Sequence, residues 1–363
     1  MLVTAIEANP LRSLDSVRVE LPTGVISIVG PNGVGKTNLV EALYFALTGR
    51  SFRTSDRRDL IPFGQSFARA EATVRDDDGL ERRLLASVSR SEGRRHLLDG
   101  NPADAATIAR HRPPVAVFAP DRLSLIKGPP GERRAHLDGF LAARWPARGE
   151  LRKRFGQALA QRNALLARIA ATGGNAGQLD AWDATLAEAA SALVAARDEA
   201  VAELSGPFAS AAAELGLEGG AALAYAPRAA GSAEEIQAGL HERRDQDVQL
   251  GRSSWGPHLD ELKVEAGGRS LRRYGSQGQQ RAALLALLFA EREVLLAARR
   301  VIPLLLLDDV MSELDPGRRA RLVRRLEGDG QALITAADEE SLPPEAIGTV
   351  VRMPLERADE MAA

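Results

Sequence analysis

Residues 30–37 read Gly30-Pro31-Asn32-Gly33-Val34-Gly35-Lys36-Thr37 and match the phosphate-binding loop pattern G-x-x-x-x-G-K-[ST] at every fixed position. An apolar, β-branched run at 25–29 precedes this segment, and apolar residues at helical spacing follow it at 39–47. Strand, glycine loop and helix in this order form the structural context that the pattern requires. The segment therefore predicts a phosphate site at the start of a helix.

Each residue type in this loop has a physical reason to be there. Glycine permits backbone angles that other residues avoid, and it lets the main chain approach an anion. Amides of the turn and of the helix N-terminus then point at phosphate oxygens. Lys36 is expected to place its charge at the outer phosphates and to assist catalysis, and the Thr37 hydroxyl is expected to ligate Mg²⁺. The expected nucleotide-binding set here is Gly30, Pro31, Asn32, Gly33, Val34, Gly35, Lys36, Thr37 and Asn38.

Composition narrows the class of protein. A chain of 363 residues is long enough for two or three domains with a large core. The formal net charge of −2 means that a nucleic-acid partner would have to bind a local basic patch. The chain has no cysteine, which excludes disulfides and thiolate metal sites, and no apolar run approaches the roughly 20 residues that cross a bilayer. The N-terminal segment has no signal-peptide pattern, so we expect a soluble cytoplasmic protein with no membrane partner.

Hydrophobic periodicity divides the chain into three regions. Strands are expected at 2–8, 15–20, 25–29, 68–74, 83–88 and 115–118. An antiparallel helical pair is expected at 147–171 and 177–215, each arm only a few turns long. A strand at 219–226, a helix at 233–247, a strand at 259–264, a hairpin through 267–274, a helix at 282–298 and strands at 302–307 and 331–335 follow.

The expected fold class is therefore α/β. Residues 1–120 and 251–363 should form the two halves of a nucleotide-binding lobe with a mixed or parallel sheet. Residues 121–250 should form a compact helical lobe with short, coiled-coil-like arms.

Two further segments add chemistry to the phosphate loop. The buried strand 302–307 ends in Asp308-Asp309, the arrangement known as Walker B. Asp308 is expected to hold Mg²⁺ directly or through water, and Asp309 to polarise the attacking water. Ser276, Gly278 and Gln279 open a long apolar helix, where amides and the helix dipole form a second anion site. By itself this second signal is weak, because serine and glycine cap helices routinely.

Together these motifs resemble the ATP-binding-cassette ATPases: a phosphate loop, a helix-opening S-x-G-Q segment, Walker B and an S-x-L-D loop at 312–315. The long separation of Lys36 from Ser276 resembles the split heads of chromosome-maintenance and recombination-repair ATPases. Within that group the chain resembles the RecF family. The segments that carry this resemblance are GPNGVGKTN, GRSFRT, GERRAHLD, QRNALL, GPHLDEL, GSQGQQR and LLLLDDVMSELD, spread over residues 30–315.

The resemblance implies a function in recombinational repair and replication, including the SOS response to DNA damage. It implies an ATP- and Mg²⁺-dependent homodimer in which Ser276, Gly278 and Gln279 face the ATP of the opposite subunit. It implies weak, DNA-stimulated ATP hydrolysis, binding to duplex DNA near single-strand gaps, and RecR, RecO and RecA as partners. Two alternatives stay open from the residues alone: an ATP-gated structural clamp or tether, and the ATPase subunit of a transporter.

The sequence also leaves several site details open. Many cassette ATPases have a histidine after the last core strand, whereas this chain has Thr335 as the nearest polar residue there. Arg50, Phe52 and Arg53 either reach a base or ribose or form a solvated loop. Basic residues of the helical lobe are candidates for DNA phosphates or for solvated helix faces: Arg133, Arg134, Arg152, Lys153, Arg154, Arg162 and Arg168.

Overall fold

The computed structural model describes residues 1–363 except 55, 77, 300, 301, 313, 327–329, 343–348 and 354–363. The chain forms two compact units, one of residues 1–123 with 295–363 and one of residues 124–294. This division differs from the expected boundaries, because residues 251–294 pack with the helical unit. Strand β10 (Glu261–Ala266) pairs antiparallel with β9 (Ala221–Ala226), and that pairing holds the segment there.

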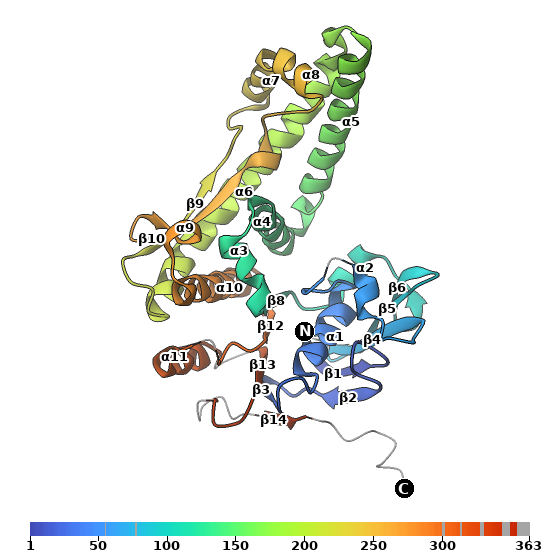
Figure 1. Ribbon diagram of the computed structural model, residues 1–363, viewed down its shortest axis with the longest axis vertical. Helices are drawn as coiled ribbons and strands as arrows, with labels where there is room; N and C mark the ends of the chain where they lie inside the picture. Colours follow the sequence, from blue (N-terminus) through green and yellow to red (C-terminus); the bar gives the residue numbers. More distant parts are fainter. Residues whose placement is uncertain are drawn as a thin grey trace. The chain divides into compact units, whose positions relative to one another are not determined.

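A five-stranded parallel sheet carries the phosphate loop in the first unit. Its strands, in sheet order, are β14 (Thr349–Arg352), β3 (Gly24–Val29), β13 (Gln331–Ala336), β12 (Leu304–Leu307) and β8 (Val115–Phe118). The last four residues of β3 and all residues of β12 are buried, as expected for interior strands of a parallel sheet. Helix α11 (Pro316–Leu326) connects β12 to β13 (Figure 1).

An antiparallel sheet of six strands forms the other layer of this unit. In sheet order the strands are β2 (Val17–Glu20), β1 (Leu2–Ala8), β4 (Phe67–Arg75), β5 (Glu81–Ser89), β6 (Gly93–Leu98) and β7 (Asn101–Pro102). Short helices accompany it: η1 (Arg57–Leu60), α2 (Ala105–Arg110) and η2 (Pro120–Leu123). Small residues such as Ala68, Ala70 and Ala72 line the inner face of β4 and let a helix approach closely.

That helix is α1 (Lys36–Thr48), which contacts both sheets of the unit. Eight of its thirteen residues are buried, and they cover more than one face of the helix. A helix that is apolar on most of its circumference must be enclosed by other elements, and two sheets supply that enclosure. Helix α1 is consequently a fixed element that runs away from the phosphate loop through the core of the unit.

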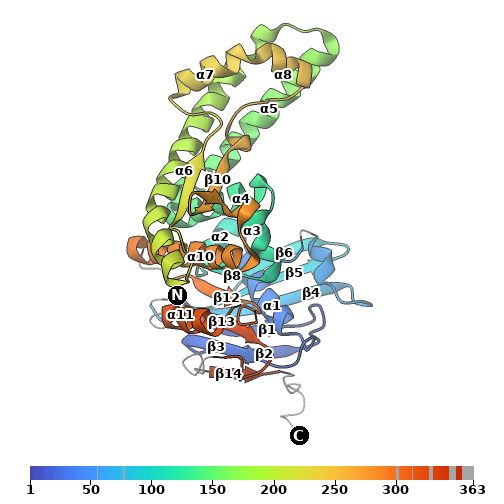
Figure 2. The same ribbon diagram turned by 60° about the vertical axis from the view of Figure 1, so that its left-hand side comes forward.

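The second unit is organised along two long helices, α5 (Leu151–Thr172) and α6 (Asp180–Glu214), which lie side by side in both views (Figures 1 and 2). Its other elements are α3 (Ser124–Lys127), α4 (Pro130–Arg144), η3 (Pro146–Arg148), η4 (Ala176–Leu179), α7 (Ala233–Glu242), α8 (Arg244–Leu250), η5 (Pro257–Leu259), β11 (Arg269–Ser270) and α9 (Leu271–Tyr274). Helix α10 (Gln277–Arg299) begins in this unit.

The structure corrects three expectations about elements. Helix α6 has 35 residues and spans about 50 Å, so the prediction that each arm is only a few turns long was wrong. The expected helix at 233–247 is divided at Arg243 into α7 and α8. Residues 271–274 form a helical turn, not a hairpin strand, and β14 was not anticipated because its four residues follow no clear alternation.

Candidate nucleotide-binding site

The phosphate loop lies between β3 and α1, as its pattern predicts. Gly33 and Gly35 have φ values of 85° and 109°, which side chains other than glycine rarely adopt. A Cβ atom on Gly30 would lie 2.6 Å from the carbonyl oxygen of Met353, so neighbouring backbone also requires glycine there. Two of the three glycines are thus required by a positive φ and the third by a close backbone neighbour, and the loop leads into the first amides of α1, which have no partner within the helix.

Lys36 lies folded over this loop. Its Nζ donates hydrogen bonds to the carbonyl oxygens of Gly30 at 2.6 Å and Pro31 at 2.9 Å. The ammonium group is thereby held next to the backbone amides that would receive an anion. Phosphate oxygens are stronger acceptors than these carbonyls, because the bond would be assisted by charge on both sides.

Asp308, at the end of β12, lies directly opposite the start of α1. The hydroxyl of Thr37 donates to both carboxylate oxygens of Asp308, at 2.9 and 3.0 Å. The hydroxyl of Thr335 also donates to Asp308, at 2.8 Å. Burial raises the pKa of the Asp308 carboxyl, while the hydrogen bonds from Thr335 and Thr37 lower it and the charge of Asp309 raises it further. A buried carboxylate with raised pKa is poised to gain from a cation.

Asp309 differs from its neighbour in both exposure and backbone geometry. It is exposed, and its φ of 51° makes it one of three non-glycine residues with positive φ among the described part of the chain. Its N–H donates to the Thr335 hydroxyl at 2.8 Å. Thr335, which the sequence marks only as the polar residue nearest to the position of the absent histidine, therefore contacts both acids.

The donors around Thr37 fit Mg²⁺. A hydroxyl and a carboxylate are hard oxygen ligands, and Mg²⁺ in nucleotide sites takes one or two such protein ligands with water and phosphate. The described residues contain no group of three or more histidine, cysteine or acidic residues that could hold a metal by themselves.

A second set of polar residues beside α1 was missed by the sequence analysis. Glu41 is fully buried and receives two hydrogen bonds from Arg12, at 2.9 and 3.0 Å, and a third from Ser51 at 2.5 Å. Arg53 contacts Glu41 at 3.4 Å and donates to Asn38 Oδ1 at 3.1 Å. An acid between Val40 and Ala42, inside an apolar helix, was the available signal of a buried ion pair.

The segment with Ser276, Gly278 and Gln279 lies in the second unit. The Ser276 N–H donates to Gln279 Oε1 at 2.9 Å, and the Gln279 N–H donates to Ser276 Oγ at 3.2 Å. This reciprocal pair is a capping box at the start of α10. Ser276 is exposed and Gly278 is half-buried, so the N-terminus of α10 is open to an incoming group. Of the S-x-L-D loop, Glu313 lies outside the described residues.

The basic residues of the helical unit that were candidates for DNA binding differ in burial. Arg162 is fully buried and donates to Asp183 at 2.7 Å and to Asp247 at 2.6 Å. The hypothesis that Arg162 binds DNA phosphates at the surface is therefore wrong. Arg133 is also buried and pairs with Glu261. Arginine rather than lysine at these positions suits a planar, bidentate pairing in the interior.

The exposed members of that set include residues with acidic partners. Arg152 lies 3.6 Å from Asp138, and Lys153 lies 3.2 Å from Glu150. The Arg154 side chain lines a cavity of about 500 Å³ between α5 and α6 with Trp182 and Glu188. The acidic partners of Arg152 and Lys153 reduce the attraction of these two side chains for a phosphate.

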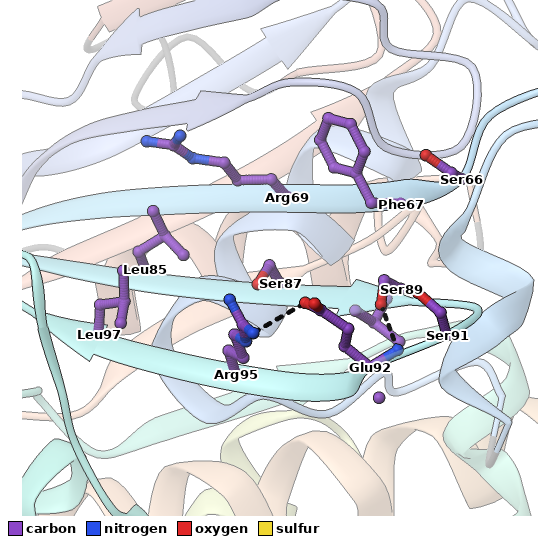
Figure 3. A pocket seen from close by; sticks show the side chains of 12 residues that line it. Ser66, Phe67, Arg69, Leu85, Ser87, Ser89, Ser91, Glu92, Arg95 and Leu97 are labelled. Carbon is purple, nitrogen blue, oxygen red and sulfur yellow. Dashed lines mark hydrogen bonds and ion pairs between the residues drawn. The ribbon is translucent and has the colours of Figure 1, made fainter.

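A further pocket, of about 450 Å³, lies on the outer face of the antiparallel sheet (Figure 3). Its lining comes from β4, β5, β6 and the turn between β5 and β6, and it includes Phe67, Leu85 and Ser87. Arg95 and Glu92 in this pocket pair at 2.9 Å. None of the phosphate-loop residues lines it, so it is separate from the candidate nucleotide site.

Comparison with known proteins covers nearly the full chain. Residues 2–355 match the family model described as RecF/RecN/SMC N terminal domain. The chain is 38% identical to the DNA replication and repair protein RecF of Streptomyces avermitilis, over 96% of this chain and 97% of the relative. It is 33% identical to RecF of Heliobacterium modesticaldum, over 96% of this chain and 95% of the relative.

Solved structures of RecF proteins are also similar to this chain. The recombination mediator protein RecF-ATPrS of the RecFOR pathway has 28% identity and a TM-score of 0.84, over 97% of this chain and 95% of that one. The corresponding RecF-ATP structure has 27% identity and a TM-score of 0.85, over 94% and 93%. An Smc head bound to the winged-helix domain of ScpA has 16% identity and a TM-score of 0.59, over 98% and 95%, and shows the shared fold alone.

Within the described ranges, every helix is too short or too polar to cross a bilayer.

Proposed function

Because the chain belongs to the RecF/RecN/SMC N-terminal domain family, and within it to the RecF proteins, we propose that it is an ATP-dependent DNA-binding protein of recombinational repair and replication. The observation that carries this proposal is the contact of Thr37 with Asp308, which joins the phosphate loop to the end of β12. That contact unites two segments 271 residues apart into one site of the kind that holds magnesium-ATP.

ATP binding uses the phosphate loop and its flanks. The amides at Gly33–Lys36 and the Lys36 ammonium receive the β- and γ-phosphates, with Lys36 releasing the carbonyls of Gly30 and Pro31. Thr37 and Asp308 would hold Mg²⁺, which supplies positive charge that neutralises the phosphates. Asn38 and Arg53, which are hydrogen-bonded to each other, are placed to define the wall of the site beside α1.

Hydrolysis uses Asp309. Its exposed carboxylate is free of the two threonine hydroxyls that engage Asp308, so it can accept a proton from the attacking water. The Thr335 hydroxyl accepts from the Asp309 N–H and donates to the Asp308 carboxylate, so it fixes the backbone of Asp309 relative to Asp308. With threonine at the place of a histidine, we propose slow turnover that DNA stimulates.

The third part of the site comes from a second copy of the chain. The open N-terminus of α10 presents the amides near Gly278 and the hydroxyl of Ser276, which suit the γ-phosphate of an ATP bound to the partner. ATP would then bind the closed dimer more tightly than the monomer, and that difference in affinity drives dimerisation. ADP lacks the γ-phosphate and should not maintain the dimer.

In the cell, we propose that this ATP-bound dimer closes on duplex DNA near single-strand gaps in the cytoplasm. RecR, RecO and RecA are the proposed partners. The relatives' names support this assignment: they describe replication and repair proteins and a recombination mediator of the RecFOR pathway.

Sedimentation velocity on the full chain tests the proposal. Samples without nucleotide, with ADP and with ATP, each with and without a duplex carrying a gap, should show a dimer only with ATP and a larger complex with DNA. Phosphate release measured on the same samples should rise when DNA is present. A chain that stays monomeric with ATP, and whose ATP hydrolysis ignores DNA, would contradict the proposal.

A further inference from the structure

Arginines gather in the first unit at the end of α1 opposite to the phosphate loop. The helix has 13 residues and is about 20 Å long, and Gly49 caps its C-terminus. Arg50 follows this cap directly, and the Nε atom of Arg57 donates to the Gly49 carbonyl oxygen at 2.9 Å. Two arginines from different elements are therefore placed at one helix end.

Strand β6 adds a third arginine. A Cβ atom on Gly49 would lie 1.9 Å from Nε2 of His96, so the imidazole lies against the helix cap. Arg94 precedes His96 by two residues in the same strand and lies on the same face of the sheet. Burial lowers the pKa of the Arg94 guanidinium, and the charges of Arg57 and Arg50 lower it further.

Arg112, from the segment between α2 and β8, completes the group. Burial and the charge of Arg50 lower its pKa, while Tyr44 of α1 raises it. The group of Arg50, Arg57, Arg94 and Arg112 is called the arginine cluster below. It has formed by tertiary folding, since its members come from four separate segments of sequence.

Within the part of the chain that the structure describes, the members of the cluster have no acidic partners, in contrast to the many paired arginines. Among the described residues, no carboxylate forms an ion pair with Arg50, Arg57, Arg94 or Arg112, although many arginines of the chain are paired. The Gly49 carbonyl oxygen at the helix end accepts a hydrogen bond from Arg57, because the C-termini of helices attract cations. The Pro113 carbonyl oxygen likewise accepts a hydrogen bond from Arg112 at 3.0 Å, but neither carbonyl supplies a full negative charge against the mutual repulsion of the guanidiniums.

The imidazole of His96 adds no positive charge to the arginine cluster. Its side chain is buried, and Nε2 has no hydrogen-bond partner. Burial, with the charges of Arg94 and Arg57, lowers its pKa to about 4, so the imidazole is neutral at physiological pH. The arginine cluster therefore stands beside a neutral, buried ring, and two of its members, Arg50 and Arg94, are exposed.

We infer that the arginine cluster binds the phosphate backbone of duplex DNA, an inference that rests on the proposed function. The cluster lies a full helix length from the phosphate loop, which separates its ligand from the phosphates of ATP. Several guanidiniums spread over four segments suit a run of phosphates. The nearby rings of Tyr44 and Phe52 pack edge to face at 5.6 Å and so are engaged with each other, which favours backbone contact over stacking on unpaired bases.

The test is a salt titration of duplex binding by fluorescence anisotropy, on the full chain with ATP. Arg50→Ala with Arg94→Ala removes two exposed charges. The slope of log K against log salt should become shallower by about 1.8, which is about 0.9 for each lost phosphate contact. Arg50→Lys with Arg94→Lys should keep the slope, because the charge remains.

Arg95→Ala is the matched control. Arg95 is the next residue of β6, it points to the opposite face, and it already has Glu92 as a partner, so its loss should leave the slope unchanged (Figure 3). Binding of a fluorescent ATP analogue and thermal melting check that the double alanine variant is folded. An unchanged slope in a folded double alanine variant would overturn the inference alone. Failure of the unaltered protein to bind duplex DNA with ATP would overturn the proposed function as well.

Discussion

At the scale of single residues, two adjacent acids at the end of β12 acquire different chemistry. Asp308 is buried and accepts hydrogen bonds from Thr37 and Thr335, whereas Asp309 is exposed. Asp309 also has a positive φ, which sets its backbone apart from that of an ordinary strand residue. Such a strained backbone in a non-glycine residue costs of order 1–3 kcal/mol, and its occurrence at this site agrees with a functional role.

Asp309→Asn should separate nucleotide binding from hydrolysis. The amide cannot accept the proton of the attacking water, so the hydrolysis rate should fall by about 10²- to 10⁴-fold. ATP affinity should change little, because Thr37 and Asp308 are untouched. Single-turnover hydrolysis and equilibrium binding of an ATP analogue measure the two effects. Normal hydrolysis by Asp309→Asn, combined with loss in Asp308→Asn, would reverse the roles assigned to the two acids.

Asp308→Asn should stabilise the nucleotide-free protein at neutral pH. Burial raises the pKa of Asp308 above its ordinary value, so the folded state holds the proton more tightly than the unfolded state. Its ionisation therefore removes stability as pH rises from the unfolded pKa through the folded one. The melting temperature of the variant should exceed that of the unaltered protein at pH 7, and the gap should close below pH 4. Thr335→Val is the comparison variant, because it keeps the carboxyl group of Asp308. Equal melting temperatures of Asp308→Asn and the unaltered protein at pH 7 would contradict the argument.

At the scale of elements, the helical unit is held together by ion pairs in its interior. Arg162 of α5 contacts Asp183 of α6 and Asp247 of α8. Arg244 of α8 contacts the same Asp183 at 2.6 Å. These charges connect three helices at defined positions. A buried ion pair adds little net stability compared with an apolar pair, but loss of one partner leaves a costly unpaired charge.

Arg162→Leu should therefore destabilise the helical unit by about 3–5 kcal/mol, because Asp247 and Asp183 lose a buried partner. Urea denaturation followed by circular dichroism measures this change. Arg168→Leu is the matched control, since Arg168 lies on the same helix, is exposed and contacts only the neutral Gln178 among the partners described for it. Its effect should stay within about 0.5 kcal/mol. Similar denaturation midpoints for both variants would show that the interior network does not stabilise the unit.

At the scale of the whole molecule, the proposed active site is divided between two chains. The phosphate loop and β12 supply one part, and the capped start of α10 supplies the other. A divided site makes ATP a ligand of the interface, so that nucleotide state and assembly state change together.

Mixing two defective chains tests this division. Lys36→Met should weaken ATP binding by about 10- to 150-fold through loss of a charge-assisted contact. Ser276→Arg should leave ATP binding by the monomer intact and abolish ATP-dependent dimerisation, because a bulky cation occupies the interface. A mixed dimer has one composite site with both defects and one with neither, so partial hydrolysis should return. The proposal is contradicted if mixed dimers form without recovery, or if Ser276→Arg alone dimerises normally with ATP.

Local sequence determined the elements that carry the site. A β-branched run, a glycine loop and an apolar helix in succession predict β3, the phosphate loop and α1, since each follows from contacts between near neighbours. The run of leucines before Asp308 likewise predicted a buried strand with acids at its end. Family resemblance, confirmed by the comparisons, supplied the split arrangement.

Only the tertiary structure decided which charged side chains are interior and which are free. Arg162 and Arg152 both belong to α5, yet one is enclosed by acids from α6 and α8 and the other lies at the surface. Thr335 became a partner of Asp308 because β13 pairs beside β12 in the parallel sheet. The arginine cluster likewise depends on contacts between segments remote in sequence. Burial and charge pairing depend on these long-range contacts, which periodicity and spacing along one chain do not encode.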